Sequence, residues 1–152
     1  MDSDPNSCAP PGAKPVAVID TNITLDLFVF NDEAAKYLRE QLESGLLTWL
    51  ATGPMRAELT RVLSYPQIAP RLLFYKLTAE DVLAKFDQHT SIVAPAPKAP
   101  VTCTDPDDQI FIDLAVAHKA VLISKDRAVL TMKKRLAALR VITGRTLQEV
   151  TK

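Results

Sequence analysis

Short apolar runs alternate with amphipathic stretches along most of the chain. The clearest apolar run is 16–19, Val-Ala-Val-Ile, which stops where Asp20, Thr21 and Asn22 begin. A β-branched run that is followed at once by polar residues is typical of a buried central strand. By the same criterion we predict further strands at 46–51, 91–94, 121–124 and 141–142.

Helices are predicted between these strands. Leucine and alanine recur at helical spacing over 31–43, and Gly45 is well placed to end that helix. Thr78 with Asp81 three residues later resembles a capping box. We also expect a helix soon after Asp20, one that begins with 52–54 and stops at 65–66, and others at 78–88, 107–119 and 127–139.

Alternating strands and helices predict an α/β fold. We expect a three-layer α/β/α sandwich around a central, mostly parallel sheet of four or five strands. A chain of 152 residues with 47% hydrophobic content is most simply one domain with an ordinary core. Residues 1–14 are rich in Pro, Ser, Asp and Ala without periodicity, which predicts a flexible tail before a single domain at 15–152.

Charge and cysteine content narrow the classes of function. With 18 basic and 18 acidic residues the net charge is zero, so a polyanion would have to be held by a local patch. The two cysteines, Cys8 and Cys103, do not form a disulfide framework or a spaced metal motif, which favours a reducing cytoplasm. We find neither an apolar run long enough to span a membrane nor a signal-peptide pattern.

Four acidic residues stand at or beside the ends of apolar segments: Asp20, Glu58, Asp108 and Asp126. Asp20 and Asp126 follow predicted strands, and ligands of parallel sheets bind beyond the carboxyl ends of the strands. If those strands are adjacent, their carboxylates meet at one edge. Crowded carboxylates repel one another unless a divalent cation neutralises them or some of them stay protonated.

Each of these residues also has an ordinary interpretation. Asp20 and Asp126 could cap helices, because Asp is favoured at that position. Asp108 could belong to an acidic first turn, which suits the helix dipole. Glu58 could form an ion pair on its own helix. The functional interpretation therefore depends on finding all four acidic residues together, since four residues with independent roles need not share one edge of the sheet.

At these residues the sequence resembles the PIN-domain family of metal-dependent ribonucleases, which includes many toxins of bacterial toxin-antitoxin systems. The resemblance extends over about 16–150. It is carried by Val-Ile-Asp-Thr-Asn at 18–22, Glu-Leu-Thr-Arg-Val-Leu at 58–63, Asp-Pro-Asp-Asp-Gln-Ile-Phe at 105–111 and Leu-Ile-Ser-Lys-Asp at 122–126. The chain looks most like the toxin branch that carries Cys-x-Asp-Pro-Asp-Asp, here at 103–108.

The resemblance implies an endoribonuclease of the VapC type that hydrolyses RNA phosphodiester bonds with Mg²⁺ or Mn²⁺. The implied catalytic residues are Asp20, Glu58, Asp108 and Asp126. Of these, Asp20, Asp108 and Asp126 would bind the metal, and Asn22, Ser124 and Asp107 would support them. Relatives often have a second acidic residue where this chain has Ala128, so we expect one well-held ion.

The resemblance also implies partners. It predicts a cytoplasmic toxin that acts on RNA, is held inactive by a small cognate antitoxin, and forms a homodimer without any membrane association. Two alternatives remain at this point. One is a non-catalytic PIN-like domain that binds RNA or protein. The other is a phosphotransfer domain with Asp20 at the end of a parallel strand, although Asn22 stands where a haloacid-dehalogenase site needs a second Asp.

Overall fold

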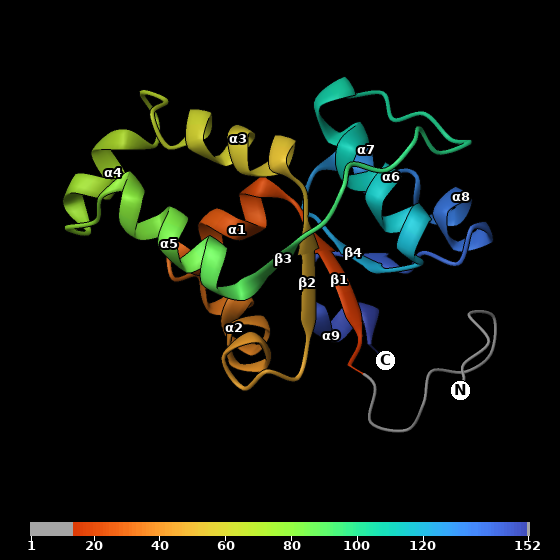
Figure 1. Cartoon of the computed structure of the whole chain (residues 1–152), viewed down its shortest axis with the longest axis horizontal. Helices are drawn as coiled ribbons and strands as arrows, with labels where there is room; N and C mark the ends of the chain where they lie inside the picture. Colours follow the sequence, from red (N-terminus) through yellow and green to blue (C-terminus); the bar gives the residue numbers. More distant parts are fainter. Residues whose placement is uncertain (1–13, 152) are drawn as a thin grey trace.

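The computed structural model describes residues 14–151 and contains a five-stranded sheet with helices on both faces (Figure 1). Every strand pairing in it is parallel, and the order is β3-β2-β1-β4-β5. The strands are β1 (Val16–Ile19), β2 (Thr48–Ala51), β3 (Thr90–Ile92), β4 (Val121–Ile123) and β5 (Thr143–Gly144). This confirms the predicted α/β/α sandwich. Cys8 and all but the last residue of the predicted tail lie outside the described residues.

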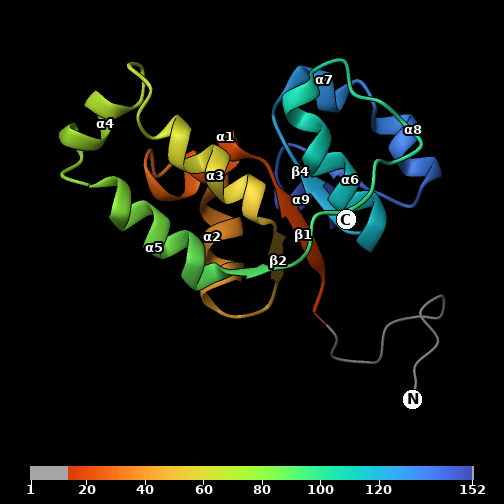
Figure 2. The same ribbon diagram turned by 45° about the horizontal axis from the view of Figure 1, so that its top comes forward.

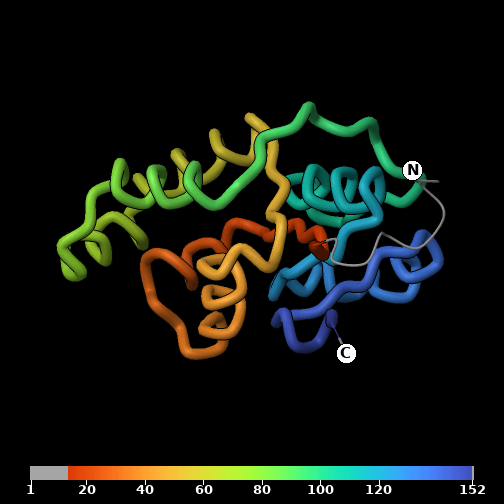
Figure 3. Tube along the Cα trace, turned by 60° about the horizontal axis from the view of Figure 1, so that its bottom comes forward, coloured from red at the N-terminus to blue at the C-terminus, as the bar shows by residue number. Residues whose placement is uncertain are grey.

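The helices lie between successive strands, except for the last helix, which follows the last strand. They are α1 (Thr21–Phe28), α2 (Lys36–Glu43), α3 (Gly53–Val62), α4 (Ala69–Phe74), α5 (Ala79–His89), α6 (Gln109–His118), α7 (Arg127–Leu130), α8 (Lys133–Ala138) and α9 (Leu147–Val150), with short 3₁₀ helices η1 (Glu33–Ala35) and η2 (Pro106–Asp108). Figures 1 and 2 show α4 and α8 at opposite ends of the molecule. Figure 3 shows α6 and α9 on opposite sides of the central strands. No helix of the described residues is long and apolar enough to cross a membrane.

The switch in strand order lies between β1 and β4. The chain adds β2 and β3 on one side of β1 and then returns to place β4 and β5 on the other side. Ile19 pairs with Ile123 in the register of the two strands, and the Asp20 amide donates to the Ile123 carbonyl oxygen over 3.1 Å. Asp20 and Ser124, the residues that follow this pair, therefore come level at the edge where α/β proteins bind ligands.

Several local signals act as predicted. Thr78 and Asp81 form a reciprocal capping box at the start of α5. The Thr52 hydroxyl accepts from the Met55 amide over 3.4 Å at the start of α3. Gly45 has φ +71°, a left-handed conformation that costs glycine little and helps to end α2.

Several element boundaries predicted from the sequence are wrong. The helix predicted at 31–43 is interrupted, because Asn31 is left-handed with φ 52° and η1 precedes α2. The helix predicted at 127–139 is two short helices, α7 and α8. The last strand lies two residues later than predicted, at β5, since β4 pairs with Thr143 and Gly144. Helix α4 was not predicted, because its exposed Leu73 and Phe74 disrupt any apolar stripe.

Trp49 is at the centre of the aromatic packing on β2. Its side chain is 1% exposed, stacks on Phe28 with ring centroids 5.8 Å apart, and meets Phe86 edge-on at 5.3 Å. Such pairs add stability beyond the area that they bury. Trp49 is therefore a core residue.

Candidate metal centre

Asp20 ends β1 and also caps α1. One carboxylate oxygen, Oδ1, accepts from the Ile23 amide over 3.0 Å, and the other, Oδ2, accepts from the Ser124 hydroxyl. The side chain is 3% exposed. Burial raises the pKa of Asp20 to about 6, although both hydrogen bonds act in the opposite direction. The capping interpretation of Asp20 is thus correct, and the same carboxylate also faces the sheet edge.

Ser124 links the ends of β1 and β4. Its fully buried hydroxyl donates to Asp20 and accepts from the Asp126 amide over 3.1 Å. Asp126 in turn caps α7, because its Oδ1 accepts from the Ala128 amide over 2.9 Å. One hydroxyl therefore orients two of the predicted acidic residues relative to each other.

Asp108 lies where η2 meets α6 and makes no side-chain capping bond to α6. Asp108 does lie in the acidic first turn of η2, so the helix-dipole interpretation of this residue stands. Its side chain is buried, and Oδ2 has no hydrogen-bond partner among the described residues. The pKa of Asp108 is raised to about 8, first by burial and then by its hydrogen bond with Asp126 and the negative charge of that carboxyl. A buried carboxylate oxygen without a partner requires an explanation.

Glu58 approaches from α3. Its Oε1 accepts from the Thr21 hydroxyl, and burial raises the pKa of this half-buried carboxyl. Arg56 makes a two-point ion pair with Asp87 instead, with both N–O distances 2.8 Å, so it is not the partner of Glu58. Glu58 thus faces the start of α1, and Arg61 on the same helix acts to lower the pKa of this carboxyl.

A cavity of about 120 Å³ brings most of these side chains to one place. We call it the acidic cavity. Its lining is Asp20, Thr21, Asn22, Glu58, Val62, Asp108 and Phe111. The predicted residues Asp20, Asn22, Glu58 and Asp108 therefore share one hollow, although they come from the end of β1, α1, α3 and η2.

Three carboxylates are close enough to hold one ion. One oxygen from each of Asp105, Asp108 and Asp126 lies within 4.8 Å of the others. Asp105 is absent from the predicted ligands. Its position three residues before Asp108 was the available signal, since residues at that spacing share one side of a turn. Asp20 lies outside this trio but lines the same cavity as Asp108.

Asp107 lies elsewhere. It is exposed and lines a separate hollow with Glu58 and Arg61. Its amide donates to Asp105 Oδ1 over 3.0 Å, so its backbone supports the turn that carries Asp105. A supporting role for the Asp107 side chain stays a prediction.

These residues fit a divalent cation. The donors are all oxygens, which suits Mg²⁺ and Mn²⁺ and does not suit softer metals. The raised pKa values of Asp20 and Asp108 reflect burial and the negative charge of neighbouring carboxyls, which Lys125 offsets only in part at Asp20. A bound cation would balance that charge and give the free oxygen of Asp108 a partner.

Comparison with known proteins assigns the family. Residues 16–128 match the model of the PIN domain. The chain belongs to the PIN-domain family. The phosphotransfer alternative is therefore wrong. A search of curated proteins gave no match.

Solved structures support the fold of this PIN domain. A chain in the crystal structure of VapBC2 from Rickettsia felis, bound to a DNA fragment from their promoter, aligns with a TM-score of 0.58. The alignment has 15% sequence identity and covers 85% of this chain and 97% of that chain. At this identity the likeness concerns the arrangement of sheet and helices alone.

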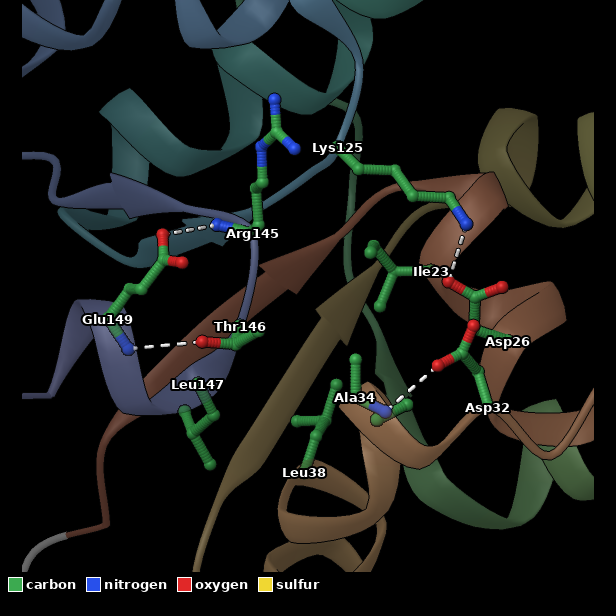
Figure 4. Close-up of a pocket in the computed structure, with 11 residues that line it drawn as sticks. Ile23, Asp26, Asp32, Ala34, Leu38, Lys125, Arg145, Thr146, Leu147 and Glu149 are labelled. Carbon is green, nitrogen blue, oxygen red and sulfur yellow. Dashed lines mark hydrogen bonds and ion pairs between the residues drawn. The ribbon is translucent and has the colours of Figure 1, made fainter.

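An ion pair joins helix α1, which follows Asp20, to the segment after β4 that carries Asp126. Lys125, between Ser124 and Asp126, extends across a hollow of about 250 Å³, and its Nζ lies 2.7 Å from Asp26 Oδ2 on α1 (Figure 4). Asp26 is 6% exposed. We expect Asp26→Asn to weaken Mn²⁺ binding about tenfold in calorimetry, because groups that orient ligands have effects of this size.

Asp32→Asn is the matched control for this variant. Asp32 lines the same hollow, but its carboxylate accepts from the Ala34 amide over 2.8 Å and not from Lys125 (Figure 4). Equal Mn²⁺ affinity in wild type and Asp26→Asn would show that the ion pair does not position the ligands.

Proposed function

We propose that this PIN domain is a metal-dependent endoribonuclease that hydrolyses RNA phosphodiester bonds with Mg²⁺ or Mn²⁺. The observation that carries the proposal is the buried, unpartnered oxygen of Asp108 within a group of three carboxylates. Structural carboxylates are normally paired or solvated, whereas this one is left for a ligand. Membership of the PIN-domain family supports the same reaction.

The acidic residues have different roles in this proposal. Asp108 and Asp126 bind the cation with Asp105, and Asp20, which lines the acidic cavity together with Asp108, is a further ligand. The Ser124 hydroxyl donates to the Asp20 carboxylate and accepts from the Asp126 backbone amide, so it helps to position both residues. When bound, Mg²⁺ or Mn²⁺ offsets the charge of the phosphate and lowers the pKa of water.

Glu58 has a different role in the proposal. The hydroxyl of Thr21 donates to its carboxylate, and both residues line the acidic cavity. Its raised pKa makes it a better proton acceptor than an exposed glutamate. Glu58 therefore orients the attacking water and receives its proton, while Asn22 contributes an amide to the same cavity.

We further propose that the protein is the toxin of a toxin-antitoxin pair in the cytoplasm, with a small cognate antitoxin as partner and a second copy of itself in a homodimer. The likeness in fold to a chain of VapBC2 and the family both support this role. Expression of the chain alone is expected to arrest growth. Arrest that persists in Asp108→Asn would separate toxicity from the acidic cavity.

Two measurements test the nuclease. The first is a calorimetric titration of Mn²⁺ into the metal-free protein, which needs no knowledge of the RNA target. The second is incubation with end-labelled single-stranded RNA in MnCl₂, in MgCl₂ and in EDTA. We expect Mn²⁺ binding and cleavage that disappears in EDTA. Metal-independent RNA binding with intact RNA would favour a non-catalytic domain.

A further inference from the structure

A second buried polar atom lacks a partner, and it lies outside the acidic cavity. The Arg39 side chain on α2 donates through Nε to the Leu27 carbonyl oxygen over 3.4 Å, but its buried Nη2 has no partner among the described residues. A guanidinium stays charged in proteins, so a buried and unpaired N–H is costly. The same kind of observation marks Asp108 in the acidic cavity.

Arg39 opens onto a cavity of about 470 Å³ between α1, α2, α5 and the turn that precedes α5. We call it the α2–α5 cavity. Figure 1 shows α1, α2 and α5 gathered on the side of the molecule away from α6–α8. The two cavities share no lining residue. A volume of this size is in the range of small-molecule sites.

The charge of the α2–α5 cavity is opposite to that of the acidic cavity. Its charged lining is Arg39, Lys85 and Glu43, so the cations outnumber the single carboxylate. Lys85 and Glu43 are exposed, whereas Arg39 is only partly exposed and its Nη2 is buried. An anion that enters between Arg39 and Lys85 would meet donors from two sides.

Aromatic rings form another wall of this cavity. The His89 ring stacks on Phe28 with centroids 5.9 Å apart and an angle of 16° between the planes. Phe28 in turn stacks on the buried Trp49, so this wall is anchored in the core. Tyr75 lines the cavity as well. A planar body can therefore lie against preformed aromatic surface.

We propose that the α2–α5 cavity binds a small phosphate ester with a planar or apolar body, the chemistry of a nucleoside monophosphate. Arg39 and Lys85 take the phosphate, and the aromatic wall takes the body. A bound RNA strand is less well suited, because strands follow extended basic grooves and the charge here is confined to one hollow. This site is independent of the proposed nuclease reaction.

The test uses the full chain in EDTA, so that metal binding in the acidic cavity plays no part. AMP, adenosine and inorganic phosphate are titrated separately by calorimetry. We expect AMP to bind more tightly than either fragment, since it alone engages both the cations and the aromatic wall. No binding of AMP at millimolar concentration would overturn the proposal.

Three substitutions at exposed positions locate the site without disturbing the core. Lys85→Gln is expected to weaken AMP binding about tenfold, as the loss of one charged hydrogen bond should. Glu43→Gln is expected to strengthen it, because the variant removes the carboxylate that repels phosphate. Lys36→Gln on α2, outside the cavity lining, should leave it unchanged.

Two other results would also overturn the proposal. One is AMP binding that responds to Lys85→Gln and Lys36→Gln alike. The other is a short RNA oligonucleotide that binds in EDTA with the expected dependence on Lys85 and Glu43 while AMP does not, which would assign the cavity to RNA. Neither result bears on Mn²⁺ binding or cleavage, so failure here is distinguishable from failure of the proposed nuclease.

Discussion

Asp20→Asn is expected to lower the rate of Mn²⁺-dependent RNA cleavage by roughly 100-fold or more, because the substitution removes one negative charge from the proposed metal site. The folded structure should survive. Asparagine is as good an N-cap as aspartate, so its side-chain oxygen can still accept from the Ile23 amide at the start of α1. The measurement is the single-turnover cleavage rate at saturating MnCl₂, with a thermal melt of the same sample.

Asp81→Asn is the matched control for Asp20→Asn. Asp81 also bonds to backbone at the start of a helix, since its Oδ2 accepts from the Thr78 amide over 2.9 Å, but it is exposed on α5 and lies outside the acidic cavity. Its cleavage rate should equal that of wild type. A wild-type rate in Asp20→Asn would mean that Asp20 is a helix cap and nothing more.

Asp108→Asn is expected to make the metal-free protein more stable near neutral pH, by about 1–2 kcal/mol after allowance for partial solvent screening. The pKa of Asp108 rises from 3.8 to about 8 in the folded state. Between these values the unfolded chain has released the proton and the folded chain still holds it. Folding stability therefore falls as pH rises from about 4 towards about 8.

Ionisation of Asp20 also lowers folding stability as pH rises, over the narrower pH range from 3.8 to about 6. Asp20 is present in both proteins, so the difference in folding stability between Asp108→Asn and wild type depends on Asp108. That difference should widen as pH rises, because asparagine does not ionise. Urea unfolding in EDTA at pH 5 and pH 7.5 measures this difference. Adding MnCl₂ at pH 7.5 should reverse the order, since the wild type gains stability by binding the ion and the variant does not.

Asp107→Asn is the control for Asp108→Asn, because Asp107 is its exposed neighbour in the same turn. That substitution should change stability little at either pH. If Asp108→Asn were less stable than wild type at both pH values, Asp108 would be a structural residue. The proposal that its free oxygen awaits a cation would then fail.

The acidic residues show how much of the candidate metal centre could be predicted from the sequence. Asp20 and Asp126 could be expected at one edge of the sheet, because each follows a strand and neighbouring parallel strands end together. Asp105 was not expected among the ligands, since an acidic turn has the same appearance whether or not it binds an ion. The structure brings it to Asp108 and Asp126 through the turn of η2.

The amino-acid sequence by itself determined the α/β class, the existence of most helices and strands, and the family, because these depend on periodicity and local motifs that neighbouring residues carry. Only the tertiary structure decided which helices break, how Lys125 reaches Asp26, and that Arg39 lines a cavity with its Nη2 unpartnered among the described residues. Those features arise between segments far apart in the chain. The energies of these interactions depend on burial and on distances between atoms, and the local sequence pattern predicts neither quantity.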